Sequence, residues 1–148
     1  MRVLIIIAIA LTCFLAAILI KRKKEARKLE SHSVTPEALH GLLSSNQGLL
    51  LVDVRQPLDL LGHSEIIPGA TRISPKEVLQ NPSLIPRDQD AVVYCTCLGE
   101  KTGRRVLNRA LALHFSRVKL LKGGLAAWKA KGYPVVTYDK PFHLDVRT

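Results

Sequence analysis

Residues 91–102 read AVVYCTCLGEKT, and this stretch decides the fold class. An apolar run ends at Cys95, a short polar loop follows, and a helical pattern of apolar residues begins near Thr102. A cysteine in such a place faces backbone N–H groups and the partial positive charge of a helix N-terminus. Both favour the thiolate and can hold an anion attached to its sulfur. The stretch therefore predicts a reactive cysteine and indicates sulfur or phosphoryl transfer.

Strand and helix patterns alternate on both sides of this loop. Strand patterns occupy residues 49–54, 91–95 and 117–121, and helix patterns occupy residues 35–43, 74–80, 102–114 and 125–131. Apolar strands separated by helices are typical of a parallel sheet covered on both faces, with ligands at the carboxyl ends of the strands. We therefore predict an α/β domain with a mostly parallel central sheet flanked by helices, and Cys95 at its carboxyl edge.

Two further motifs flank the cysteine loop. Residues 53–55 read DVR at the end of a strand, followed by GH at 62–63 and IPGA at 67–70, and residues 121–128 read LKGGLAAW, followed by GYPV at 132–135. In this order the motifs resemble the N-terminal and C-terminal signatures of the rhodanese family, over about residues 34–136. The resemblance implies a single rhodanese-like domain that carries a persulfide on the loop cysteine.

Two cysteines compete for the role of nucleophile. The commonest sulfurtransferase loop reads C-x-x-G-x-R-[S/T], and Thr102 lies one step too far from Cys95 and one step too near to Cys97. Spacing therefore does not choose between them. Cys95 directly follows the strand, as the family's nucleophile does. We predict Cys95 as the nucleophile and keep Cys97 as the second choice or as a resolving thiol.

The same resemblance implies an anion-binding loop after Cys95. Its members are Thr96, Cys97, Leu98, Gly99, Glu100, Lys101 and Thr102. Lys101 stands about where the family has an arginine, so it supplies charge without the planar fork that grips a sulfonate or phosphate. An inward Glu100 would repel an anionic donor, and we expect this side chain to point to solvent.

Asp53, Arg55 and His63 are the supporting residues that the resemblance implies. We expect Asp53 to be buried at its strand end. Arg55 either reaches toward the pocket or forms a salt bridge with Asp53 or Asp59, and His63 is expected to stabilise a turn through hydrogen bonds. Trp128 is predicted to lie in the core.

The N-terminal segment predicts a transmembrane anchor. Residues 3–20 read VLIIIAIALTCFLAAILI, 18 residues without a charge, Gly or Pro, and as a helix they would span about 27 Å. A signal peptide is the competing interpretation, but no small-x-small cleavage site separates the apolar run from the basic residues that follow it. Six basic residues at positions 21–28, against Arg2 alone, favour a single-pass cell-membrane protein with its N-terminus outside and its domain in the cytoplasm.

Charge and composition fit one small domain behind such an anchor. About 118 of the 148 residues remain after the anchor and its flank, enough for one hydrophobic core. Residues 31–148 contain 15 Lys or Arg and 10 Asp or Glu, so half of the net charge of +10 lies in the N-terminal segment, where it would contact lipid head groups. No basic stripe with interleaved aromatic residues is present, so we expect no nucleic-acid partner.

Metal and cofactor sites are not indicated either. The chain has three cysteines, one of them Cys13 in the apolar run, which is no disulfide framework and fits a reducing compartment. Two loop cysteines without a nearby histidine supply only half of a zinc site. No cofactor motif is present, and we expect no cofactor. The expected partners are the lipid bilayer, through residues 3–20 and the basic flank, a small sulfur donor or thiol acceptor, and a possible partner protein.

These patterns divide the chain into four segments: an anchor at 1–20, a basic juxtamembrane linker at 21–33, the rhodanese-like domain at 34–136 and a C-terminal tail at 137–148. The expected function is a membrane-anchored sulfurtransferase that carries sulfane sulfur as a cysteine persulfide. A non-catalytic rhodanese-like module that positions a partner is the alternative. A phosphatase or arsenate reductase on the same fold is a second alternative, because the spacing from Cys95 to Lys101 matches the length of a C-x5-R loop.

Overall fold

The computed structural model describes residues 1–45, 48–96 and 100–141, with backbone alone at residues 2–5 and 8. The predicted loop residues Cys97, Leu98 and Gly99 therefore lie outside the described residues. The chain divides into two compact units, residues 1–32 and residues 33–148.

The first unit is one helix, α1 (Arg2–Ser31). Its sequence contains no Pro or Gly and is rich in Ala, Leu, Lys, Arg and Glu, which are good helix formers. The helix ends at His32, whose backbone N–H donates to the Leu29 carbonyl oxygen at 3.2 Å.

Among the residues whose side chains the structure describes, no helix combines the length and the apolar character needed to cross a membrane. The predictions of a transmembrane anchor at 1–20 and of a single-pass location in the cell membrane with a cytoplasmic domain are therefore wrong.

The second unit is built on a five-stranded parallel sheet with the strand order β1-β6-β5-β2-β4. The strands are β1 (Ser33–Val34), β2 (Leu50–Asp53), β4 (Thr71–Arg72), β5 (Ala91–Tyr94) and β6 (Val118–Leu121). In the centre, β5 pairs with β2, with Asp53 opposite Tyr94, and with β6, with Val93 opposite Leu120. Every residue of β5 is buried, which explains its uninterrupted apolar sequence. The predicted parallel sheet is confirmed.

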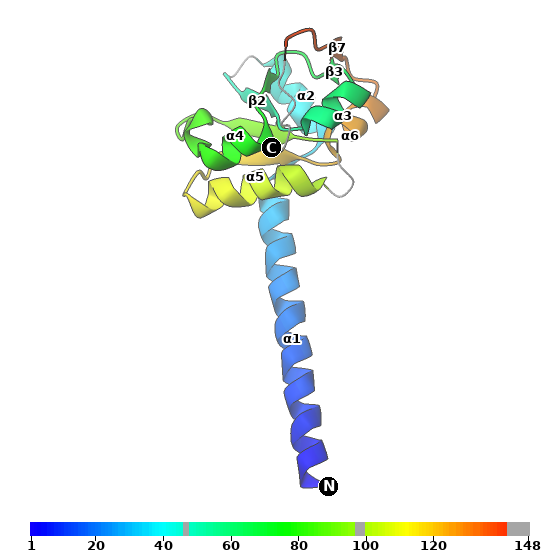
Figure 1. Cartoon of the computed structure of the whole chain (residues 1–148), viewed down its shortest axis with the longest axis vertical. Helices are drawn as coiled ribbons and strands as arrows, with labels where there is room; N and C mark the ends of the chain where they lie inside the picture. Colours follow the sequence, from blue (N-terminus) through cyan, green and yellow to red (C-terminus); the bar gives the residue numbers. More distant parts are fainter. Residues whose placement is uncertain (46–47, 97–99, 142–148) are drawn as a thin grey trace, which may run out of the picture. The chain divides into compact units, whose positions relative to one another are not determined.

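Helices cover both faces of this sheet (Figure 1). They are α2 (Pro36–Ser44), α3 (Pro57–Gly62), α4 (Pro75–Gln80), the 3-10 helix η1 (Pro82–Leu84), α5 (Lys101–Ala112) and α6 (Gly124–Ala130). Side chains cap the starts of two of these helices. The Thr35 hydroxyl caps α2 by accepting from the Ala38 N–H at 3.3 Å, and Ser74 and Glu77 form both halves of a capping box on α4.

Side chains of β5 alternate between the two faces, as strand geometry requires. Val92 and Tyr94 pack in one cluster with Leu39 of α2 and with Leu125 and Trp128 of α6. Trp128 is 1% exposed and donates from Nε1 to the Pro134 carbonyl oxygen at 2.8 Å, so its predicted place in the core is confirmed. Val93 and Cys95 belong to the opposite face, which α5 covers.

Six short elements escaped the sequence patterns: β1, α3, β4, η1 and the two strands of a small second sheet. That sheet pairs β3 (Glu65–Ile66) antiparallel with β7 (Val136–Thr137), and the Tyr138 N–H donates to the Ser64 carbonyl oxygen at 2.7 Å. Strands of two residues are too short to show a period. The pairing holds residues 136–138 against the segment that follows α3.

Candidate functional site

Cys95 follows β5 directly and lies at the carboxyl edge of the sheet, as predicted. Its residue is 2% exposed. The Leu125 N–H, at the start of α6, donates to the Cys95 carbonyl oxygen at 3.1 Å. A contact between the ends of β5 and α6 therefore holds the backbone at this position.

The Cys95 sulfur faces the first turn of α5. Gly103 lies in that turn, and a Cβ atom built on it would lie 3.5 Å from Cys95 Sγ and 2.5 Å from Leu120 Cδ1. The contact that is too close for a side chain is the one with Leu120 of β6, whereas 3.5 Å to the sulfur is an ordinary van der Waals separation. The first N–H groups of a helix have no partner within the helix, so α5 brings the positive end of its dipole toward the cysteine.

Glu100 closes the loop at its far end. It is the N-cap residue of α5, has a left-handed backbone with φ of 57°, and makes no side-chain cap to the helix. Its carboxylate instead accepts a hydrogen bond from the Gly123 N–H and lies 3.6 Å from the Arg104 guanidinium, with its side chain 16% exposed. The expectation that Glu100 points to solvent is wrong, because the turn before α6 offers its carboxylate an N–H partner.

The other described residues of the loop differ from one another in how far they are exposed. Thr96 is half-buried, Lys101 is exposed and Thr102 is half-buried at the start of α5. The charge of Lys101, at the position where the family has an arginine, is thus presented to solvent.

Asp53 and Arg55 form a completely buried ion pair, each with 0% exposure. Arg55 Nε donates to both Asp53 carboxylate oxygens, at 2.9 and 2.8 Å, and Arg55 Nη1 and Nη2 donate to the His63 and Glu65 carbonyl oxygens at 2.7 and 2.8 Å. The predicted burial of Asp53 is confirmed. Of the alternatives for Arg55, the structure shows the salt bridge with Asp53, which fastens the end of β2 to the chain after α3.

His63 contributes to this arrangement through its backbone. Its N–H donates to the Asp59 carbonyl oxygen at 3.0 Å, and its own carbonyl oxygen accepts from Arg55. The imidazole is exposed and lines a pocket. The turn is therefore stabilised by main-chain groups of His63.

Tyr94, next to the nucleophile candidate, was not singled out by the sequence. It is completely buried, and its hydroxyl accepts from the Ile67 N–H at 3.2 Å. Burial, and then the nearby Asp53 carboxylate, raise the pKa of Tyr94 far above its ordinary value. This side chain therefore stays neutral and connects β5 to the IPGA segment.

A pocket of about 300 Å³ opens beside the loop. It is lined by His63, Glu65, Thr96, Leu125, Ala126 and Lys129. Leu125 and Ala126 form an apolar wall on α6, and the Lys129 ammonium pairs with the Glu65 carboxylate. Thr96, adjacent to Cys95 in the chain, is the described loop residue that reaches this pocket.

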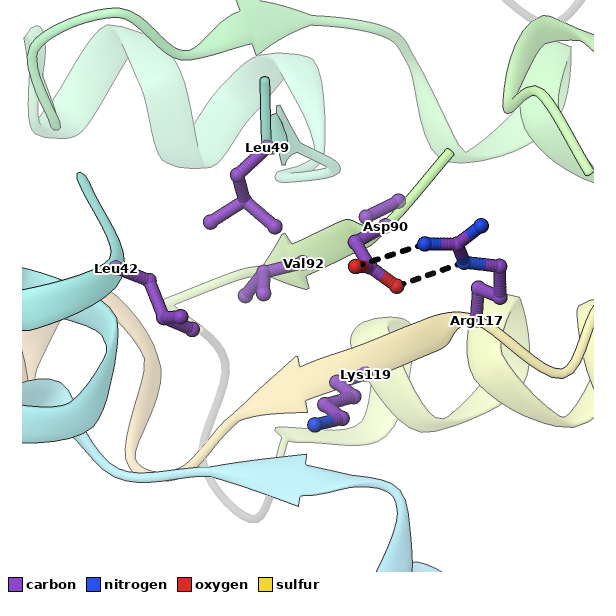
Figure 2. A pocket seen from close by; sticks show the side chains of 7 residues that line it. Leu42, Leu49, Asp90, Val92, Arg117 and Lys119 are labelled. Carbon is purple, nitrogen blue, oxygen red and sulfur yellow. Dashed lines mark hydrogen bonds and ion pairs between the residues drawn. The ribbon is translucent and has the colours of Figure 1, made fainter. Parts of the chain in front are cut away.

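A second pocket, of about 100 Å³, lies at the opposite edge of the sheet, where β5 and β6 begin (Figure 2). Arg117 donates to both carboxylate oxygens of Asp90 there, at 2.9 and 3.0 Å, and this hydrogen bonding lowers the pKa of Asp90. The lining of the pocket includes Ala91 and Val92 at the start of β5, so Val93 and Tyr94 lie between this pocket and Cys95. It does not belong to the candidate site.

In the part of the chain that the structure describes, no group of three or more His, Cys, Asp or Glu side chains is placed to hold a metal ion.

Known proteins resemble this chain over the second unit. The model of the rhodanese-like domain family matches residues 35–131. A sulfurtransferase of Allochromatium vinosum is 31% identical over 108 residues, which are 71% of this chain and 94% of that protein. A probable adenylyltransferase/sulfurtransferase, MoeZ of Mycobacterium tuberculosis, is 33% identical over 116 residues, which are 74% of this chain and 27% of that much longer protein.

Solved structures share the fold. A rhodanese-related protein from Thermoplasma volcanium superposes with a TM-score of 0.58 at 22% identity, over 71% of this chain and 97% of that one. At this identity the likeness concerns the fold alone: an α/β arrangement with a mostly parallel central sheet flanked by helices.

Proposed function

Because the chain belongs to the rhodanese-like domain family, we propose that it is a sulfurtransferase in which Cys95 carries a sulfane sulfur as a persulfide. The observation that carries this proposal is the place of Cys95: it directly follows the central strand β5 at the carboxyl edge of the sheet, with its sulfur against the first turn of α5. Cysteines at helix N-termini are the ones that ionise and react readily. The family and the geometry therefore favour the same residue.

The reaction has two displacement steps. The Cys95 thiolate attacks the sulfane sulfur of a donor, a sulfur–sulfur bond forms on Cys95, and the donor's own bond to that sulfur breaks, with the electron pair leaving on the donor fragment. An acceptor thiolate or cyanide then attacks the outer sulfur, and the Cys95 thiolate leaves. No external oxidant or reductant is required.

The surroundings of Cys95 suit a persulfide anion. The N-terminal end of α5 supplies partial positive charge to an anion on the sulfur. Because Cys95 is 2% exposed, the persulfide would be sheltered from water. The pocket beside Thr96 is the described space where donor and acceptor can bind.

Intact mass spectrometry of the full chain tests this proposal. Incubation with a sulfane-sulfur donor should add the mass of one sulfur atom, and a thiol acceptor or cyanide should remove it. Cys95→Ser should abolish the adduct, whereas Cys97→Ser and Cys13→Ser should retain it. An adduct that survives in Cys95→Ser and disappears in Cys97→Ser would assign the nucleophile to Cys97.

The same preparation separates the alternatives. Hydrolysis of an aryl phosphate that depends on Cys95 would favour a phosphatase, although the exposed Lys101 lacks the planar fork that suits phosphoryl transfer. If the wild-type chain takes up no sulfur from several donors, the proposal is refuted in favour of a non-catalytic module.

A further inference from the structure

The Glu100 carboxylate is a fixed negative charge at the start of α5, the helix whose first turn lies beside Cys95 Sγ. The carboxylate accepts a hydrogen bond from the Gly123 N–H, which holds it in place, and only 16% of the Glu100 side chain is exposed. A left-handed backbone at Glu100 turns the chain so that this contact can form.

Two contacts connect this charge to Cys95. Glu100 is the N-cap residue of α5, and a Cβ on Gly103, in the first turn of that helix, would lie 3.5 Å from Cys95 Sγ. The Gly123 N–H that bonds the carboxylate is followed by Gly124, where a Cβ would lie 2.0 Å from the Cys95 carbonyl oxygen. The helix that Glu100 precedes and the turn that its carboxylate bonds therefore both pack against Cys95.

Three described cations, Arg104, Lys101 and Lys129, offset this negative charge weakly. Arg104 lies 3.6 Å from Glu100, but its side chain is 47% exposed and screened by water. Lys101 is exposed. Lys129, in the adjacent pocket, is paired with Glu65. The pocket wall formed by Leu125 and Ala126 is apolar.

From this arrangement we infer that Glu100 selects the sulfur donor by charge, so that the site favours an organic sulfane-sulfur donor of low negative charge over the thiosulfate dianion. The inference rests on the proposed function and specifies its substrate class. A carboxylate held between two elements that pack against Cys95 repels each negative charge of a donor that approaches the sulfur, in a site where water screens less than in bulk. The apolar wall at Leu125 and Ala126 accommodates an organic group attached to the sulfane sulfur.

Two donors with the same scissile bond test this inference. Thiosulfate carries two negative charges and releases sulfite, whereas benzenethiosulfonate carries one and releases benzenesulfinate; both give the same Cys95 persulfide. Single-turnover rates of sulfur uptake are measured by intact mass on the full chain and divided by the rates of each donor with free cysteine. We expect the normalised rate for benzenethiosulfonate to exceed that for thiosulfate by about tenfold or more at low ionic strength.

The variant Glu100→Gln removes the charge but keeps an oxygen that can accept from Gly123. It should raise the rate of sulfur uptake from thiosulfate about five- to tenfold and change the rate from benzenethiosulfonate less. In high salt, the difference in thiosulfate rate between the variant and the wild type should disappear. Asp90→Asn is the matched control, because it removes one negative charge at the opposite sheet edge, on a residue that bonds Arg117. It should leave the donor ratio unchanged.

Three outcomes overturn the inference: equal normalised rates in the wild type, an equal change for both donors in Glu100→Gln, or the same shift of the ratio in Asp90→Asn. An absence of sulfur uptake from either donor refutes the proposed function itself, which distinguishes the two failures. Thermal melting of Glu100→Gln beside the wild type identifies any loss of rate that comes from unfolding.

Discussion

Gly124 lies directly against the backbone of Cys95. Its φ is +55°, and a Cβ at position 124 would lie 2.0 Å from the Cys95 carbonyl oxygen and 3.1 Å from the carbonyl carbon. The next residue, Leu125, donates its N–H to the same oxygen at 3.1 Å. The glycine pair of the LKGGLAAW motif therefore has a physical role at the candidate site: the second glycine lets α6 begin in contact with Cys95.

Gly124→Ala should lower both stability and sulfur uptake. The left-handed backbone costs about 1–2 kcal/mol for a residue with a side chain, and the close contact with backbone atoms adds about 1–3 kcal/mol. Urea denaturation measures the free energy of unfolding. Gly41→Ala is the control, because nothing lies within 4 Å of a Cβ there, and alanine inside a helix should stabilise the chain by about 0.5–1 kcal/mol. Wild-type stability in Gly124→Ala would contradict the contact.

Loss of the Arg55 guanidinium should destabilise the second unit strongly. Arg55→Met leaves the completely buried Asp53 carboxylate without its ion-pair partner, which typically costs about 3–5 kcal/mol. Arg117→Met removes the exposed pair with Asp90 and should cost about 1 kcal/mol or less. Denaturation curves of the two variants make the comparison, and similar losses would show that burial does not govern the Arg55 network.

Glu37 should titrate at unusually low pH. A hydrogen bond from Lys131 is the main cause that lowers the pKa of Glu37 from 4.5 to about 2. Because the folded-state pKa lies below the unfolded one, the pair's contribution to stability is present above pH 4.5 and is lost as the pH falls toward 2. NMR titration of the carboxyl carbon should give this low midpoint. Lys131→Met should move it upward, and an unmoved midpoint would exclude Lys131 as the cause.

Residues 33–148 should fold without α1. The described contacts divide the chain between residues 32 and 33, and the parallel sheet with its covering helices lies wholly in the second unit. A chain beginning at Ser33 should unfold in one cooperative transition, with coincident circular dichroism and fluorescence curves. Non-coincident curves, or the absence of a melting transition, would show that the second unit depends on the helix.

Much of the second unit followed from its sequence because the signals are local. The apolar run before Cys95, the Ser74–Glu77 capping box and the helical spacing after Lys101 each depend on neighbours within a few residues. Together with the glycine motifs, they were sufficient for the parallel sheet and for Cys95 at its edge. The N-terminal helix was also predictable, whereas the membrane location inferred from its apolar run was wrong.

Tertiary structure alone decided which partners Arg55 and Glu100 bind near the cysteine loop. Whether Arg55 reached the pocket or paired with Asp53 depended on carbonyl groups of His63 and Glu65 that the fold brings to it. The inward position of Glu100 depended on Gly123, which lies 23 residues further along the chain. Sequence spacing predicts contacts within one strand or helix. The Glu100 carboxylate instead bonds the N–H group that folding places beside it. That partner depends on how the turn after β6 meets the start of α5.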